Sequence, residues 1–208
     1  MDRSNAPTRR PARPRRARRI RPTLVAFTLA LALASMGADT PADPVLDGYA
    51  HFVADDGQIE FSPAKLERLV HLGSWFVPEG DAAGFHHVYT QRAAIERFRD
   101  AGRFPDGAVL VKEIVRARRG SYTTGADVAS ATRTQQWFVM VKDARGRFPD
   151  HPLWGDGWGW ALFGSEAPTT NVASDYRADC LGCHAPAQRS DWVYVEGYPA
   201  LHPPADGS

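Results

Sequence analysis

The chain has 208 residues, a length that fits one domain. Its 25 basic and 24 acidic residues nearly cancel, but nine of the basic residues are arginines among the first 21 positions. Without these nine and Asp2, 16 basic and 23 acidic residues remain, which is a net charge near −7. This balance excludes the basic surface of a nucleic-acid-binding domain.

The N-terminus combines this arginine cluster with an apolar run of eleven residues, Leu24–Ala34, and small residues up to Ala38. The pattern predicts a secretory signal peptide over residues 1–38, cleaved after Ala38 or, alternatively, after Ala34. A membrane span needs about 20 apolar residues, so we expect no stable span after cleavage. An organellar transit peptide would spread its arginines along an amphipathic helix, whereas here they end before the apolar run. We therefore expect bacterial export, to the periplasm or the medium.

The remaining chain is predicted to fold as α+β, mostly an antiparallel β-sheet with two or three short helices. Residues 39–60 are expected to form a flexible segment, residues 61–202 the domain and residues 203–208 a tail. Helices are predicted from Ser62 to Gly73, over Gln91–Ala101 and over Asp175–His184. Strands are predicted at 75–77, 86–90, 108–115, 136–142, 158–163 and 192–195, with a loop over 164–174.

A C-x-x-C-H motif occupies residues 180–184. It is typical of c-type haem attachment, in which the thiols of Cys180 and Cys183 add to the two vinyl groups and His184 ligates the iron. A thioredoxin-like pair would follow a strand in a βαβ unit, and no such alternation surrounds the motif. A zinc site needs about four ligands, which is more than the motif provides. The sequence therefore predicts one covalent haem c, bound at one face of the sheet near the C-terminus.

A sixth protein ligand to the iron is not evident from the sequence. No methionine follows the motif, and Met140 lies within a predicted strand, where a core position is the simpler interpretation. The remaining histidines are also possible ligands: His51, His71, His86, His87, His151 and His202. We expect five-coordinate iron with an open distal position, which favours small-ligand binding or catalysis over electron relay.

Lys112 lies between Leu110 and Ile114 on one face of the strand 108–115. A lysine at such a position can extend along an edge strand to water. Lysine is scarce, however, with three against 22 arginines, so this amine is a candidate functional group. Burial lowers the pKa of an amine and leaves a nucleophilic lone pair.

The order and spacing of several motifs resemble the cytochrome P-460 family, which includes the cytochrome c′-beta proteins. The resemblance covers roughly residues 66–201. Its pieces are Phe104-Pro105-Asp106-Gly107, Val111-Lys112-Glu113, Val139-Met140-Val141-Lys142-Asp143, Trp158-Gly159-Trp160, the motif at 180–184, Asp191-Trp192-Val193 and Tyr198-Pro199.

This resemblance implies a mostly antiparallel fold, a homodimer, and a five-coordinate haem c. In the cytochrome P-460 enzymes, a lysine at the position of Lys112 is bonded to the porphyrin, and hydroxylamine is oxidised with nitrous oxide as a product. The c′-beta relatives lack that bond, have an apolar distal side and bind nitric oxide. Where the enzymes carry a distal arginine, this chain has His86, which could relay protons. No distal carboxylate is evident, because the segment before Val139 consists of the bulky apolar residues Trp137 and Phe138.

Three functions follow, in order of preference. The first is hydroxylamine oxidation, with His86 and Lys112 as catalytic residues and a redox partner cytochrome as electron acceptor. The second is nitric oxide binding without turnover, which the aromatic residues Trp137 and Phe138 favour. The third is electron transfer, which needs a sixth ligand.

Overall fold

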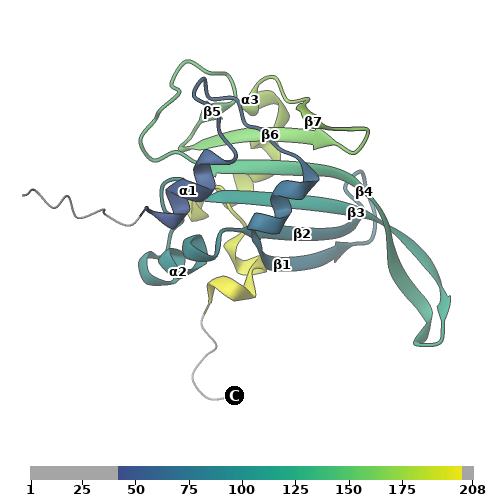
Figure 1. Ribbon diagram of the computed structural model, residues 1–208. Coiled ribbons are helices and arrows are strands. Elements are labelled where there is room, and N and C mark those ends of the chain that lie inside the picture. The colour runs from purple at the N-terminus through teal and green to yellow at the C-terminus, as the bar shows by residue number, and fades with distance from the viewer. Residues whose placement is uncertain (1–41, 203–208) are drawn as a thin grey trace, which may run out of the picture. The chain divides into compact units, whose positions relative to one another are not determined.

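The computed structural model describes residues 42–202. The expected signal peptide and the tail at 203–208 lie outside these residues. Seven antiparallel strands form one sheet in the order β1-β2-β3-β4-β6-β5, with β7 paired to β6 (Figure 1). The strands are β1 (Val70–Val77), β2 (Gly84–Thr90), β3 (Val109–Tyr122), β4 (Gly125–Lys142), β5 (Trp154–Gly155), β6 (Trp158–Gly164) and β7 (Ala167–Asn171).

Short helices surround this sheet, and the described domain is α+β, as the sequence predicted. The α-helices are α1 (Pro44–Ala50), α2 (Arg92–Ala101), α3 (Tyr176–Asp179) and α4 (Leu181–His184). The 3₁₀ turns are η1 (Pro63–Arg68), η2 (Ala185–Ser190), η3 (Val195–Gly197) and η4 (Pro199–Leu201). Helix α2 ends as predicted at Gly102, which adopts the left-handed conformation with φ of 68°.

The two faces of the sheet are both covered, because alternate residues of each strand enter different hydrophobic clusters. Leu110 packs with Met140, Trp160 and the C-terminal segment, while Val109 and Val111 pack on the opposite face. In Figure 1 the N-terminal helix α1 lies in front of the sheet and the yellow C-terminal segment behind it. The cysteine motif therefore lies against the face that carries Leu110.

The domain begins earlier than residue 61, so the expectation of a flexible segment over residues 39–60 is corrected in its described part. Asp43 caps α1, accepting a hydrogen bond from the Val45 N–H. Val45, Phe52 and Ile59 are buried, and Val53 pairs with Ile59 in a short bridge. Among the described residues, Asp43 and Pro44, which contributed to that expectation, instead form the start of a helix.

The predicted helix from Ser62 to Gly73 is wrong beyond its first turns. Ser62 makes no side-chain cap, η1 ends at Arg68, and β1 already begins at Val70. Gly73 is not a helix end but lies at an irregularity in the β1–β2 pairing. A side chain there would collide with the backbone of Gly197 and with Tyr198, so glycine permits the C-terminal segment to approach the strand.

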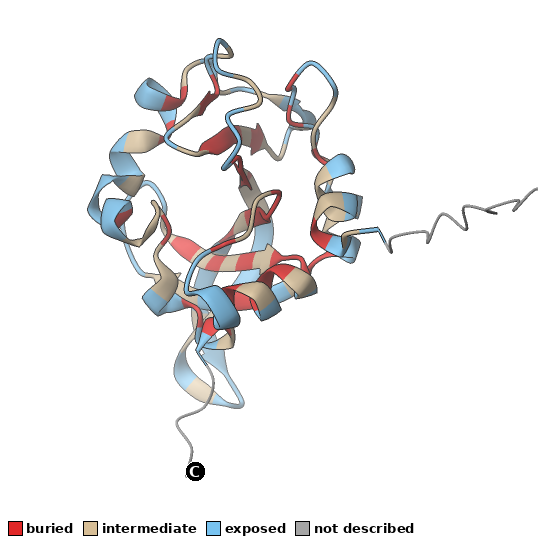
Figure 2. Ribbon diagram, turned by 90° about the vertical axis from the view of Figure 1, so that its left-hand side faces the viewer, coloured by how far each residue is buried: buried red, intermediate tan, exposed pale blue. Residues whose placement is uncertain are grey.

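Three further differences concern strand limits. Strands β3 and β4 extend past the sheet as a ribbon in which no residue from 116 to 136 is buried (Figure 2). Strand β7 occupies part of the predicted loop 164–174, because it pairs with β6. The strand expected at 192–195 is absent from the described structure, since Trp192 has a φ of 66° and η3 begins at Val195.

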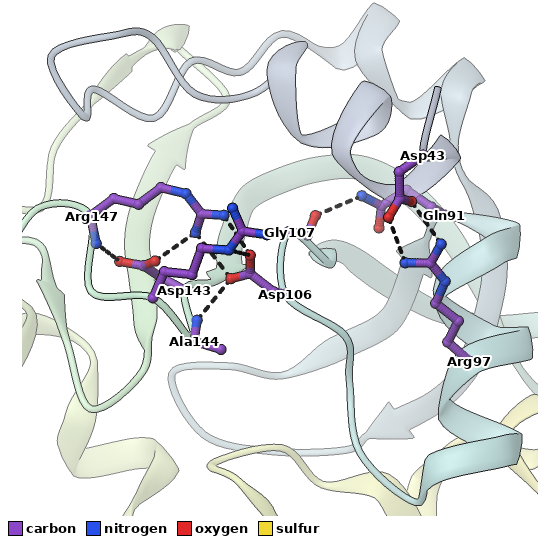
Figure 3. A network of polar contacts seen from close by, with 9 residues as sticks. Asp43, Gln91, Arg97, Asp106, Gly107, Asp143, Ala144 and Arg147 are labelled. Carbon is purple, nitrogen blue, oxygen red and sulfur yellow. Dashed lines mark hydrogen bonds and ion pairs between the residues drawn. The ribbon is translucent and has the colours of Figure 1, made fainter. Parts of the chain in front are cut away.

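A polar cluster joins the two turns in which the sequence Gly-Arg-Phe-Pro-Asp occurs (Figure 3). Arg147 of the second copy binds Asp106 of the first at 3.0 Å and Asp143 at 2.6 Å. Burial alone would raise the pKa of Asp106, but hydrogen bonds from Arg147 and the Ala144 N–H lower it overall. Nearby, Arg97 makes a bidentate pair with Asp43. These pairs attach α1 and the turn after β4 to the α2–β3 region.

Candidate functional site

A cavity of about 390 Å³ lies between the sheet and the C-terminal segment. Its size is within the range of small-molecule and cofactor sites. From the sheet it is lined by Trp75, His86, Val88, Leu110, Lys112, Phe138 and Met140, and from the C-terminal segment by Cys183, His184, Val193, Tyr194, Glu196, Gly197 and Tyr198. Four of the five site residues predicted from the sequence therefore share one cavity.

His184 is held in the form that can ligate a metal. Its Nδ1 lies 2.7 Å from the carbonyl oxygen of Trp192, and because a carbonyl only accepts, Nδ1 carries the proton. Nε2 then keeps its lone pair. The ring of Trp160 packs edge-on against the imidazole at 5.0 Å between centroids. Burial lowers the pKa of His184 below 6.5, although the bond to Trp192 opposes this, so the imidazole is neutral near pH 7.

The two cysteines lie in different surroundings although only two residues separate them. Both are free thiols. Cys183 is exposed on the cavity wall, whereas Cys180, the residue between α3 and α4, is buried in a hydrophobic cluster. Burial raises the pKa of the Cys180 thiol to about 12. Tyr194 fixes the backbone here by donating from its hydroxyl to the Cys183 carbonyl at 2.7 Å. The predicted helix over 175–184 is thus two short helices that meet at Cys180.

Lys112 lies on the cavity wall together with Leu110, with which it shares a face of β3. Its Nζ is 4.6 Å from the ring centre of Phe138, the residue directly opposite on β4. Burial lowers the pKa of the amine, while the nearby Cys183 acts in the other direction. The larger effect of burial increases the neutral, nucleophilic fraction of the amine.

His86 is buried, with 4% of its surface exposed. Its Nε2 lies 2.6 Å from the carbonyl oxygen of Ala82 and therefore carries the proton. Its Nδ1 is buried without a hydrogen-bond partner and keeps a lone pair. Burial lowers the pKa of His86 below 6.5, and Lys112 contributes in the same direction, so the ring is neutral near pH 7.

The sequence did not identify every residue that lines the cavity. Of the two aromatic residues before Val139, only Phe138 lines the cavity, because Trp137 points to the opposite face and packs on Phe61. Met140 lies in the core as expected but also reaches the cavity wall. Glu196 was missed, and it provides a carboxylate at the cavity from η3. Its signal in the sequence was only its position between Tyr194 and Tyr198.

The other histidines do not line this cavity. His71 and His87 share a hydrogen-bonded serine, Ser74, which lies 2.6 Å from a ring nitrogen of each. His87 belongs to the opposite face of β2 from His86. His51, His151 and His202 bond to Arg68, to Leu153 and to Val195 respectively. Within residues 42–202, no three His, Cys, Asp or Glu side chains are grouped to hold a metal ion.

The family model for cytochrome P460 matches residues 63–195, more than half of the chain. The chain belongs to the cytochrome P460 family. It is therefore a haem cytochrome, and the matched range contains His86, Lys112 and the motif at 180–184. A comparison with curated proteins gives no match. Among the described helices, none is both long and apolar enough to cross a membrane.

The residues at the cavity fit the haem that the cytochrome P460 family implies. The neutral imidazole of His184 has a free Nε2, and the thiol of Cys183 lies beside it on the same wall. The sheet wall is largely apolar, with Val88, Leu110 and Phe138. An apolar wall with few polar groups is the usual surrounding of a bound cofactor.

Proposed function

We propose that this protein is an exported c-type cytochrome that oxidises hydroxylamine to nitrous oxide. Cys180 and Cys183 would hold one haem covalently, and His184 would be the only protein ligand of the iron. The haem supplies the redox chemistry when bound. In the overall reaction, two hydroxylamine molecules give one nitrous oxide, one water, four protons and four electrons, and the electrons pass to an external redox protein such as a cytochrome.

The observation that best supports an enzymatic function is the protonation state of His86. The reaction releases protons, so the site needs an acceptor near the substrate. His86 is neutral, and its Nδ1 is buried beside the cavity with its hydrogen-bonding capacity unused. The Ala82 carbonyl fixes the opposite nitrogen and so sets the tautomer. His86 would accept a proton at Nδ1 and return it to water.

Lys112 is proposed as the residue bonded to the porphyrin. The proposal is supported by its place on the cavity wall and by the burial that lowers the pKa of its amine. Such a bond replaces one N–H and one C–H with a C–N bond and releases two protons and two electrons. Its formation therefore consumes an oxidant, such as a peroxide.

Mass spectrometry of the protease-digested, haem-loaded protein tests this proposal. We expect the peptide with Lys112 and the peptide with Cys180 and Cys183 to travel together with one haem. We also expect purified protein to consume hydroxylamine, and Lys112→Ala to weaken this activity, whereas Lys65→Ala, a change of a surface lysine, leaves it intact. A free Lys112 peptide from fully loaded protein would refute the bond.

Nitric oxide binding without turnover is the second candidate function. It is favoured by Phe138, which places an aromatic ring on the sheet wall where a carboxylate would assist an oxidase. Saturable nitric oxide binding without hydroxylamine consumption would put this function first. Electron transfer is the third and requires a sixth ligand, for which Met140 and His86 on the wall are the candidates.

A further inference from the structure

The turn that follows η2 has an unusual backbone. Asp191 and Trp192 adopt successive left-handed conformations, with φ of 59° and 66°, and neither is a glycine. Such conformations persist in non-glycine residues only where the surroundings fix them. The turn brings the carbonyl oxygen of Trp192 to Nδ1 of His184. The position of this carbonyl, and with it the orientation of the imidazole, depends on what holds Asp191.

Asp191 is held from the sheet by two side chains. Nζ of Lys142 lies 2.8 Å from the Asp191 carboxylate, and Nε1 of Trp158 donates to the Asp191 carbonyl at 3.0 Å. Lys142 is the last residue of β4, Trp158 the first of β6, and the two are direct partners in the sheet. Lys142 also lies 4.8 Å from the centre of the Trp158 ring. Lys142 is buried, and Trp158 is fully so, which makes this a fixed support.

We propose that Lys142 and Trp158 are positioning residues for the iron ligand, acting through Asp191 and the Trp192 carbonyl on His184. This inference rests on the proposed haem ligation by His184. Without the ammonium group, the Asp191 carboxylate loses its closest partner and keeps only the longer contact of 3.4 Å to Nε1 of Trp158, so the left-handed turn relaxes toward an extended backbone. The Trp192 carbonyl then leaves Nδ1, so the imidazole can rotate and donates less electron density.

The support also links the two walls of the cavity. Lys142 and Trp158 belong to the same strand pair that carries Phe138 and Met140 on the sheet wall. The position of His184 is therefore fixed by the sheet as well as by its own short helix, which has four residues. A change at Lys142 alters the ligand although the lysine itself does not line the cavity.

Resonance Raman spectroscopy of the haem-loaded ferrous protein tests the inference through the iron–histidine stretching band. In Lys142→Gln we expect this band to move to lower frequency and to broaden, and the reduction potential to rise. Lys142→Arg keeps a cation within reach of Asp191 and should restore the wild-type band. Lys65→Gln, which removes a lysine from its surface pair with Glu60, is the matched control and should leave the band unchanged.

A second variant covers the case in which Lys142→Gln yields no folded protein. Trp158→Phe keeps an aromatic ring, smaller than the indole, but removes the donor to the Asp191 carbonyl, and it should shift the band in the same direction. A wild-type band in loaded Lys142→Gln or, failing that protein, in loaded Trp158→Phe overturns the inference alone. A wild-type protein without an iron–histidine band overturns the proposed ligation, and the inference falls with it.

Discussion

Replacing His86 by glutamine separates its chemical role from its structural one. A glutamine amide can still donate to the Ala82 carbonyl, so a hydrogen bond that contributes about 0.5–1.5 kcal/mol is retained. It cannot accept a proton near neutral pH. Because a positioned general base contributes roughly 100- to 10,000-fold, we expect hydroxylamine oxidation to fall by about that factor. Haem loading and nitric oxide binding should be retained.

The pH dependence gives the second part of this test. The folded pKa of His86 lies below its ordinary 6.5, so the reactive neutral form prevails above pH 6.5 and is lost as the pH falls through the folded pKa. kcat/KM of the wild type should show that acidic decline, measured by steady-state hydroxylamine oxidation, and His86→Gln should lack it. His87→Gln, one residue away on the opposite face, is the control. Wild-type activity with an unchanged acidic decline in His86→Gln would refute the reasoning.

Three further outcomes are expected. Cys180→Ser and Cys183→Ser should each lower covalent haem, measured by haem staining after denaturing electrophoresis; a wild type without covalent haem contradicts the attachment. Magnetic circular dichroism of the ferrous protein should report high-spin iron with His184 as sole protein ligand, and a low-spin spectrum would favour electron transfer. Arg147→Ala should lower the free energy of unfolding by about 2–3 kcal/mol at pH 7. Because the pKa of Asp106 is held below 3.8, this difference should shrink below pH 3.8 in denaturant titrations, and a constant difference would contradict the assignment.

Local patterns in the sequence predicted the parts of the fold that depend on local physics. Helix α2 has the apolar face and the terminal glycine that were predicted, and Leu110 and Lys112 share one face of β3, as the period of a strand predicts. The failures concern segments whose state depends on distant partners. Pro63 suggested a helix start, but pairing of β1 with β2 takes over by Val70. Trp192 resembled a strand residue, but its backbone is left-handed and its carbonyl accepts a hydrogen bond from His184.

The sequence predicted those parts of the candidate site in which a single side chain provides the chemistry at a fixed position within a motif or a strand. The motif at 180–184 is of this kind, and so is Lys112 within its strand. The support of His184 was not predictable, because Lys142 and Asp191 are 49 positions apart and either could have been an ordinary surface charge. Glu196 was missed for a similar reason, since a 3₁₀ turn leaves no periodic pattern in the sequence.

Considered separately, Lys112 favours the enzyme and Phe138 favours nitric oxide binding. In the structure, however, the two residues form one cross-strand pair. The face of an aromatic ring attracts an ammonium group by about 0.5–2 kcal/mol and so favours the charged amine. Burial favours the neutral amine and lowers the pKa of Lys112, while Cys183 acts in the opposite direction. The ring thus binds the charged, unreactive form and attracts the neutral, nucleophilic form less. The ring and burial therefore act on the Lys112 amine in opposite directions, and a bond to the porphyrin would draw on the neutral fraction that burial supplies.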